Sequence, residues 1–151
     1  MRYRIVAVGK LKEPFYRSGV QHYLARLRAL APCETLEVRE GKGSVDDVKR
    51  AEGQALIAAA DGHVVALHEG GRTFGTRALA QHIGQLELLG NSRLTVLIGG
   101  ANGHDDQLLA STAESWSLSA LTFPHDLARL VLLEQLYRVE TVRAGHPYHR
   151  D

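Results

Sequence analysis

The residues best equipped for chemistry lie near the end of the chain, at positions 138–150. This segment mixes arginine, histidine and tyrosine and lacks the apolar periodicity of a core element. Arginine contacts phosphate, tyrosine and histidine stack on bases, and histidine titrates near neutral pH. The mixture predicts RNA contact, and a frayed terminus is the alternative. The expected basic RNA-binding surface also draws on positions outside the tail, and comprises Lys10, Lys12, Arg129, Arg143, His146 and Arg150.

A second candidate is a crevice between two strand ends. The apolar, β-branched run at 94–98 is typical of a strand buried on both faces, and Gly99 and Gly100 follow it directly. A short strand at 117–121 is expected to break at Pro124, where a helix can begin. Strand ends that open into such loops form the crevices in which open α/β sheets bind ligands. The glycine spacing is not that of the dinucleotide fingerprint or the phosphate loop, so a plain tight turn is the alternative.

Other familiar kinds of active site find no support in the sequence. His68 and His104 are isolated in loops and are expected to be exposed and idle. Histidine, cysteine and carboxylate residues show no metal-ligand spacing, so no metal is predicted. The serines at 115, 117 and 119 alternate in a strand without a nucleophile elbow, which gives no basis for serine catalysis.

The elements that must position these residues alternate along the chain. Strands are expected at 4–8, 34–38, 64–67, 94–98 and 117–121, and helices at 14–30, 45–60, 76–89, from about 105 to 114, and 126–139. Ser44 and Thr76 suit helix N-caps, and residues 68–72 are expected to form a loop. Five such units predict an α/β fold with a three-layer, mostly parallel sheet.

The last helix is apolar around most of its circumference, from Leu127 to Leu136. A helix of this kind is normally buried on all sides. Near the end of a small chain, a second subunit is the natural cover, so a homodimer interface beside the crevice is predicted. A central core helix in a monomer is the alternative.

Length and composition set the outer bounds. The 151 residues, 44% hydrophobic and 23% charged, suit one globular domain spanning 1–151. The formal net charge of +1 does not by itself indicate a nucleic-acid binder. The single cysteine, Cys33, fits a reducing compartment. No apolar run approaches the length of a membrane span and no signal peptide is evident, so a cytoplasmic protein without membrane partners is expected.

Five segments, in order, resemble a known family. They are Ala-Val-Gly-Lys-Leu-Lys at 7–12, Leu-Ile-Gly-Gly-x-x-Gly at 97–103, Leu-Ser-x-Leu-Thr-Phe-Pro-His at 118–125, Glu-Gln-Leu-Tyr-Arg at 134–138 and His-Pro-Tyr-His-Arg at 146–150. The chain closely resembles, from end to end, the bacterial large-subunit rRNA pseudouridine-N3-methyltransferases of type H, which are SPOUT methyltransferases. Their turn often carries Pro-Glu where this chain has Ala101 and Asn102.

The resemblance implies a SPOUT-type fold with a C-terminal trefoil knot, a homodimer and S-adenosylmethionine as cofactor. It implies a 23S rRNA target, pseudouridine 1915, in a stem-loop at the subunit interface of the assembled ribosome. The positions matching the family's cofactor site are Leu67, Gly99, Gly100, Leu118, Ser119, Ala120, Leu121, Thr122, Phe123 and Pro124. Glycines there let the main chain approach the cofactor, while leucine and phenylalanine offer apolar walls.

For this reaction the N3 proton of pseudouridine must leave, which calls for a general base. The expected catalytic group is His125, Arg138, Tyr148 and His149. Either histidine would accept the proton, Tyr148 would stack on the base, and Arg138 would stabilise negative charge on the uracil oxygens. The sequence leaves open which residue is the base, and whether the tail serves its own site or a partner's. Two other functions stay open: methylation of a different RNA, and ribosome binding without catalysis.

Overall fold

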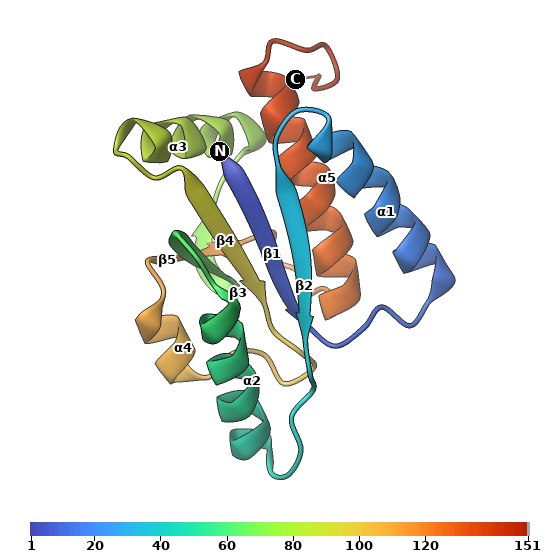
Figure 1. The fold of residues 1–151 in the computed structure, drawn as a ribbon, viewed down its shortest axis with the longest axis vertical. Helices are drawn as coiled ribbons and strands as arrows, with labels where there is room; N and C mark the ends of the chain where they lie inside the picture. The colour runs from blue at the N-terminus through green and yellow to red at the C-terminus, as the bar shows by residue number, and fades with distance from the viewer. Residues whose placement is uncertain (151) are drawn as a thin grey trace.

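The computed structural model describes residues 1–150, in which strands and helices alternate (Figure 1). The strands are β1 (Arg2–Val8), β2 (Cys33–Val38), β3 (His63–Thr73), β4 (Arg93–Ile98) and β5 (Glu114–Ser117). The helices are α1 (Pro14–Arg28), α2 (Val45–Ala59), α3 (Thr76–Leu88), α4 (Asp106–Ser111) and α5 (His125–Arg143). The strands form one sheet in the order β2-β1-β4-β3-β5, with every pairing parallel. The predicted α/β class and parallel sheet are confirmed.

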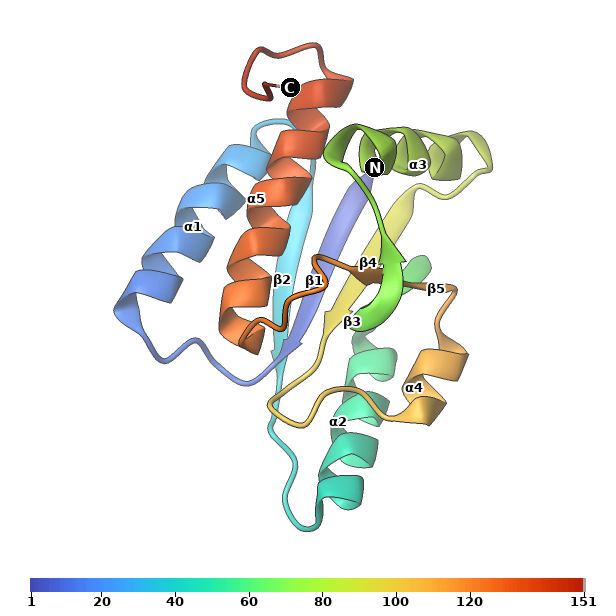
Figure 2. The same cartoon turned by 180° about the vertical axis from the view of Figure 1, so that it is seen from behind.

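Helices cover both faces of the sheet. On one face α1, α3 and α5 pack over a core that includes Ile5, Val96 and Leu133. On the other, α2 and α4 pack over a smaller core around Val6 and Leu97. Figures 1 and 2 show the two sets on opposite sides. Alternate residues of β1 and β4 therefore serve different cores, which explains why both strands are apolar on both faces.

One of the two predicted helix caps is confirmed and the other is wrong. The Ser44 side chain accepts a hydrogen bond from the Asp47 N–H, as predicted. At α3 the prediction is wrong, because Gly75 is the N-cap and Thr76 is the first helical residue. The Thr76 hydroxyl instead donates to Gln135 Oε1 on α5, 2.9 Å away, and so ties the two helices together.

The predicted loop at 68–72 is also wrong, because β3 continues through it to Thr73. Leu67 and Arg72 both pair with Trp116, so β3 bulges between them. A Cβ atom at Gly71 would lie 2.7 Å from the Ser115 carbonyl carbon, so the close approach to β5 requires glycine.

The segment predicted as a strand at 117–121 is mostly a loop, because β5 ends at Ser117. The Ser117 hydroxyl donates to the Ser119 carbonyl, and the Leu121 N–H donates to Ser119 Oγ. These local bonds replace ladder bonds and bend the chain away from the sheet. The following helix begins at His125 and runs to Arg143, beyond the predicted end at 139. The trefoil knot stays a prediction.

Helix α5 is covered largely by its own chain. Leu132, Leu133, Leu136 and Val139 are fully buried against the sheet, α1 and α3. The core-helix alternative therefore accounts for most of its apolar circumference. Within residues 1–150, no helix combines the length and apolar character needed to cross a membrane.

Candidate functional site

A cleft of about 630 Å³ opens at the carboxyl ends of β4 and β5 and beside the bulge of β3. The turn after β4 forms one wall, and the loop between β5 and α5 forms another. Nine of the ten predicted cofactor positions line it: Leu67, Gly99, Gly100, Leu118, Ser119, Leu121, Thr122, Phe123 and Pro124. Ala120 is exposed and does not line the cleft. The structure thus brings together two segments that the sequence separates by about twenty residues.

In the turn after β4, a side chain at Gly100 would be tightly packed against its neighbours. A Cβ atom at Gly100 would lie 3.1 Å from Glu52 Oε1 and 3.2 Å from Val8 Cγ1. Gly103 has a φ of +75°, a conformation that favours glycine. The backbone of this turn therefore faces the cleft directly, and a ligand can approach its amide and carbonyl groups.

His104, expected to be exposed, is buried at the back of the cleft. Its Nε2 lies 3.2 Å from the Leu97 carbonyl oxygen, which can only accept a hydrogen bond. Burial lowers the pKa of His104, so the neutral ring donates from Nε2 and leaves Nδ1 as an unpartnered acceptor. His68 is half-buried, and its Nδ1 accepts a bond from the Gly70 N–H. The prediction that His104 is exposed is wrong, and His68 lies in β3 instead of a loop. Both histidines line the cleft.

The rim of the cleft carries an exposed apolar side chain, and a hydrogen bond from the next residue holds this part of the rim in place. Leu121 is 72% exposed at the rim. The neighbouring Thr122 hydroxyl donates to Glu69 Oε2 across the opening, at 3.0 Å. An exposed leucine beside the partly buried Leu118 and Phe123 gives the cleft an apolar mouth that a flat, apolar ligand would cover.

The tail forms a closed polar cluster at the other end of α5. Arg138 Nε donates to Glu134 Oε1 at 2.9 Å, and Tyr148 OH donates to the same oxygen at 3.3 Å. The Arg138 guanidinium lies 4.8 Å from the Tyr148 ring centre, and its Nη1 lies 3.4 Å from His149 Nδ1. The Tyr148 ring also packs on Tyr137, with centroids 4.6 Å apart. This arrangement shows a tail that is packed, as opposed to the frayed alternative.

Glu134 is the member of this tail cluster that sequence reasoning missed. It stands four residues before Arg138 on a helix, the spacing of a favourable ion pair, and that signal was available.

One chain does not assemble the predicted catalytic group. His125 lines the cleft at the start of α5, whereas Arg138 lies 13 positions along the helix, about 20 Å away at 1.5 Å per residue. Figure 2 shows α5 running from the cleft end to the tail end of the molecule. Arg138, Tyr148 and His149 do meet, but His125 is not with them. The predicted helix at 126–139 already contained Arg138, so this separation followed from the sequence prediction but was not applied to the catalytic group.

The predicted basic surface is only partly assembled. Lys10 and Lys12 line a second cavity of about 310 Å³, which shares Gly100 and His125 with the cleft. Arg129 is not available on a surface: it is 4% exposed, and its guanidinium donates to Glu37 Oε2 at 2.7 and 2.8 Å. Burial lowers the pKa of Arg129.

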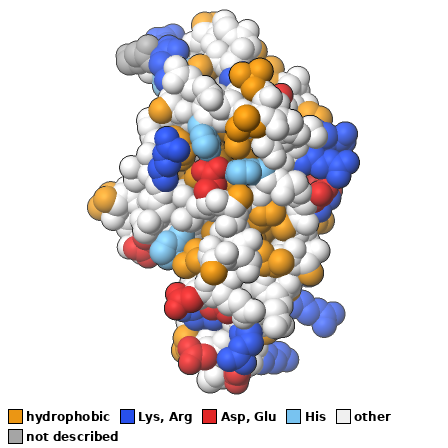
Figure 3. All heavy atoms as spheres, turned by 90° about the vertical axis from the view of Figure 1, so that its left-hand side faces the viewer, with side chains coloured by type: hydrophobic (Ala, Val, Ile, Leu, Met, Phe, Trp, Pro, Cys, Tyr) orange, Lys and Arg blue, Asp and Glu red, His pale blue; other side chains and the backbone are white. Residues whose placement is uncertain are grey.

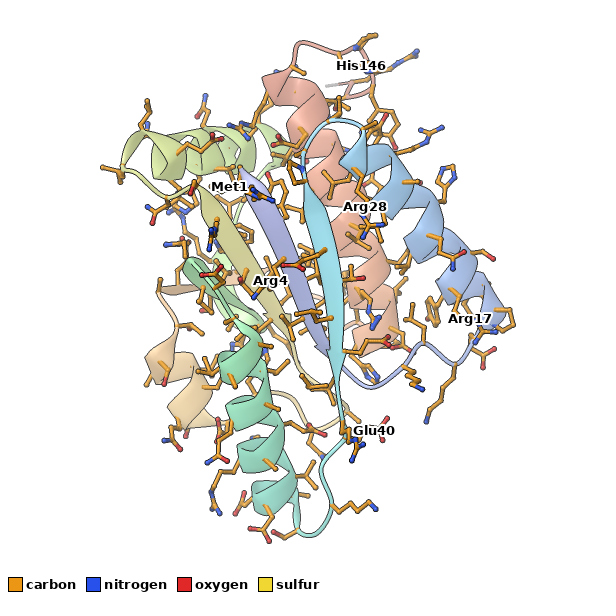
Figure 4. The ribbon with its side chains drawn as sticks, in the orientation of Figure 1. Met1, Arg4, Arg17, Arg28, Glu40 and His146 are labelled. Atoms are coloured by element: carbon orange, nitrogen blue, oxygen red, sulfur yellow. The ribbon has the colours of Figure 1, made fainter. Side chains whose placement is uncertain are left out.

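The remaining predicted RNA contacts lie at the tail end, away from the two lysines. Arg143 is bound by Glu140 and Glu87, and Figure 4 places His146 at the opposite end of the molecule from Glu40, which lines the second cavity. Arg150 is exposed beyond the tail cluster.

The family description "Predicted SPOUT methyltransferase" matches residues 1–149. The chain belongs to the SPOUT methyltransferase family. Full-length relatives agree. The ribosomal RNA large subunit methyltransferase H of Shouchella clausii is 40% identical over 159 residues, covering 99% of this chain and all of the relative. Its counterpart in Thermus thermophilus is 42% identical and covers 99% of each chain.

Solved structures share the SPOUT fold at low sequence identity. A probable methylase family protein from Haemophilus influenzae has a TM-score of 0.55 at 13% identity, over 99% of this chain and 70% of that one. A putative methyltransferase from Legionella pneumophila, solved with the bound cofactor SAM, has a TM-score of 0.51 at 12% identity, over 91% of this chain and 66% of that one.

A separate polar cluster lies at the β5 edge of this SPOUT sheet. Glu114 accepts hydrogen bonds from His63 Nε2 at 2.6 Å, His82 Nε2 at 2.9 Å and Trp116 Nε1 at 2.7 Å. Burial alone would raise the pKa of Glu114, but these bonds outweigh it and leave the pKa below its ordinary value. On the side of the molecule that carries β5, Figure 3 shows histidine and acidic side chains lying together among apolar ones. No group of His, Cys, Asp and Glu side chains within residues 1–150 is arranged to hold a metal ion.

Proposed function

We propose that this chain methylates ribosomal RNA with S-adenosylmethionine, and that the cleft holds this cofactor. The full-length relatives named as rRNA methyltransferases support the reaction. The cleft fits the cofactor because its turn leaves little space for a side chain at Gly100, and because Leu67, Leu118 and Phe123 offer apolar walls. The single observation that carries the proposal is this glycine-backed cleft at the carboxyl ends of parallel strands.

The proposed target is N3 of a pseudouridine in 23S rRNA, position 1915, on the assembled ribosome in the cytoplasm. End-to-end resemblance over the tail and cleft segments supports this choice. The chain's net charge of only +1 is compatible with recognition of the ribosome through its shape and through a local basic patch on the protein. Lys10 and Lys12 beside the cleft would supply such contacts.

When bound, the cofactor supplies an electrophilic methyl group for in-line transfer, so the chain's own residues mainly position the reactants. His125 lies at the cleft, within the region a target base must enter. Arg138 would stabilise negative charge on the uracil oxygens, and Tyr148 would stack on the base. The N3 proton would leave to a residue at the assembled site.

A homodimer would bring the cleft of one chain and the tail cluster of the other together. Leu127, Val131, Glu134 and Arg138 form a half-buried stripe along α5, and Leu127 and Val131 do not pack against the core of their own chain. This stripe runs from the cleft end to the tail cluster. A two-fold contact along it would place each tail beside the partner's cleft, because such an interface uses the same surface on both copies.

The test is methyl transfer from labelled S-adenosylmethionine to ribosomes that lack this modification, with and without prior pseudouridine formation. We expect label in large-subunit rRNA of whole ribosomes, dependent on pseudouridine, and its loss in Tyr148→Ala. Label in a different RNA would favour a SPOUT methyltransferase with another target. Ribosome binding without cofactor binding or label would favour a non-catalytic ribosome-binding protein.

A further inference from the structure

The cavity beside the cofactor cleft contains a carboxylate oxygen that nothing satisfies. Glu52 on α2 lines this cavity and is 5% exposed. Its Oε2 accepts a hydrogen bond from the Gly41 N–H at 2.9 Å, but Oε1 has no partner. Among the side chains of residues 1–150, Glu52 Oε1 and His104 Nδ1 are the only buried polar atoms left without a partner. Leaving a buried acceptor unpaired costs about 1–3 kcal/mol, so such an atom marks a place where a donor is expected.

The cavity adjoins the cleft at the turn after β4. The turn residues Gly100, Ala101 and Asn102 line both cavities, as does His125. Glu52 Oε1 lies 3.1 Å from the place that a Gly100 Cβ would occupy, so no side chain separates the carboxylate from the turn. A ligand in this cavity would therefore stand directly beside a ligand in the cleft.

The cavity has the size and polarity for one pyrimidine ring. Its volume of about 310 Å³ is half that of the cleft and at the low end of the roughly 300–1,000 Å³ found for ligand sites. Lys10, Lys12 and Asn102 supply donors, and Glu52 supplies an acceptor. A uracil-type edge presents a ring N–H between two carbonyl oxygens, so it needs one acceptor and two donors, which are the kinds of group that these side chains carry.

We propose, resting on the function proposed above, that this cavity is the subsite for the methyl-accepting base and that Glu52 accepts its ring N–H. Lys10 and Lys12 then bind the flanking carbonyl oxygens or the backbone of the same nucleotide. The sulfur–methyl bond of the sulfonium donor breaks as the new N–C bond forms, so the positively charged sulfonium becomes a neutral thioether. The N–H bond of the base breaks and its proton moves to Glu52.

Glu52→Gln is the direct test, because the amide keeps the shape of the side chain. Its carbonyl oxygen still accepts from Gly41, and its NH₂ then stands where Oε1 stood, so a donor faces the donor of the base. Glu13→Gln is the matched control, since it removes the same charge from an exposed residue of the neighbouring loop. Glu52→Asp keeps the carboxylate but withdraws it, and is expected to fall between the wild type and Glu52→Gln.

The first readout is binding and involves no turnover. With S-adenosylhomocysteine present, wild type and Glu13→Gln are expected to bind unmethylated ribosomes about tenfold more tightly than ribosomes already methylated at the target nitrogen, the effect of one hydrogen bond to a charged group. Glu52→Gln is expected to lose this preference while its affinity for S-adenosylmethionine, measured by calorimetry, stays unchanged. Single-turnover methyl transfer is expected to fall about 100-fold.

Two results would overturn the assignment in different ways. If Glu52→Gln keeps both the binding preference and the transfer rate of the wild type, the subsite assignment is wrong and the proposed function stands. If wild-type protein neither binds S-adenosylmethionine nor labels ribosomal RNA, the proposed function is wrong and the subsite assignment falls with it. Melting temperatures of all variants near that of the wild type confirm that the comparison is between folded proteins.

Discussion

The two ends of helix α5 carry polar groups in opposite states. At its start, the cleft and the adjoining cavity hold two buried acceptors without partners, Glu52 Oε1 and His104 Nδ1. At its far end, Arg138, Tyr148 and Glu134 satisfy one another in a closed cluster. The first region therefore combines open cavities with unpaired acceptors, whereas the polar groups of the second region bond to one another. The difference supports the proposal that the cleft end binds the cofactor and the target base, and that the tail end completes the site of another copy.

The two regions are widely separated along α5. About 20 Å of helix separates His125 from Arg138. A single chain therefore cannot bring both regions to one reacting atom without unfolding α5. In the proposed homodimer, a second copy docked along the half-buried stripe of α5 would resolve the separation without any change of conformation.

The largest expected effect comes from filling the cleft end. Gly100→Val places a branched side chain against Glu52 and Val8, and a displacement of about 1 Å at a reacting centre costs about 100-fold in rate. We expect calorimetry to detect no binding of S-adenosylmethionine and no label to enter ribosomal RNA. Gly84→Val is the control, since a Cβ there meets nothing within 4 Å. Normal cofactor binding by Gly100→Val would show that the turn is not part of the site.

At the tail end, Arg138→Ala is expected to lower methyl transfer about 100-fold and to leave cofactor affinity unchanged, because its role is charge stabilisation away from the cleft of its own chain. Arg93→Ala, at the start of β4 and paired with Asp61, is the control, because it removes an ion-paired arginine outside the predicted sites. It should transfer methyl groups normally. Equal losses of activity in both variants would remove the special role of the tail cluster.

Arg129 tests a residue that lies close to the cleft but not in it. Arg129→Met removes the buried partner of Glu37, and we expect a loss of about 2 kcal/mol in the free energy of unfolding by urea. Affinity for ribosomes should not change in the fraction that remains folded. A selective loss of ribosome affinity at unchanged stability would restore the interpretation of Arg129 as an RNA contact.

The smallest expected effect lies outside both regions, at Glu114. Its pKa is lower in the folded chain than in the unfolded chain. The stabilisation is therefore fully present above the unfolded value, roughly pH 4.3, and is lost as pH falls through the folded-state pKa. Glu114→Gln should cost about 1 kcal/mol at pH 7 and progressively less in acid. A cost independent of pH would show that the ionised carboxylate contributes nothing.

Sequence patterns located the elements well wherever periodicity and capping are local. The Val-Leu-Ile run of β4 and the Ser44 cap are determined by their own neighbours, and both predictions are confirmed. The continuation of β3 through 68–72 was missed because it depends on the close approach of Gly71 to β5, a contact distant in sequence. Ser117–Leu121 alternates like a strand, but side-chain bonds to its own backbone decide its shape.

Most of the candidate site was predicted from the resemblance to a known family, and not from the physical properties of the residues. Nine of the predicted cofactor positions line one cleft. No local pattern indicates that Glu52 and His104 are buried beside it, because their burial comes from how α2 and the β4 turn pack. Arg129 was misjudged because its partner, Glu37, lies on a strand far away in sequence. Charges read along a chain say little about which of them face solvent.

We propose that a cleft from one copy and a tail from another form one active site, and mixing of subunits tests this arrangement. Gly100→Val and Arg138→Ala, each inactive alone, are unfolded together, refolded as a mixture and assayed on ribosomes. Random pairing makes half of the dimers mixed, and each mixed dimer has one intact site, so about a quarter of wild-type activity should return. If mass spectrometry demonstrates mixed dimers but no activity returns, each chain completes its own site, and a site shared between two copies is contradicted.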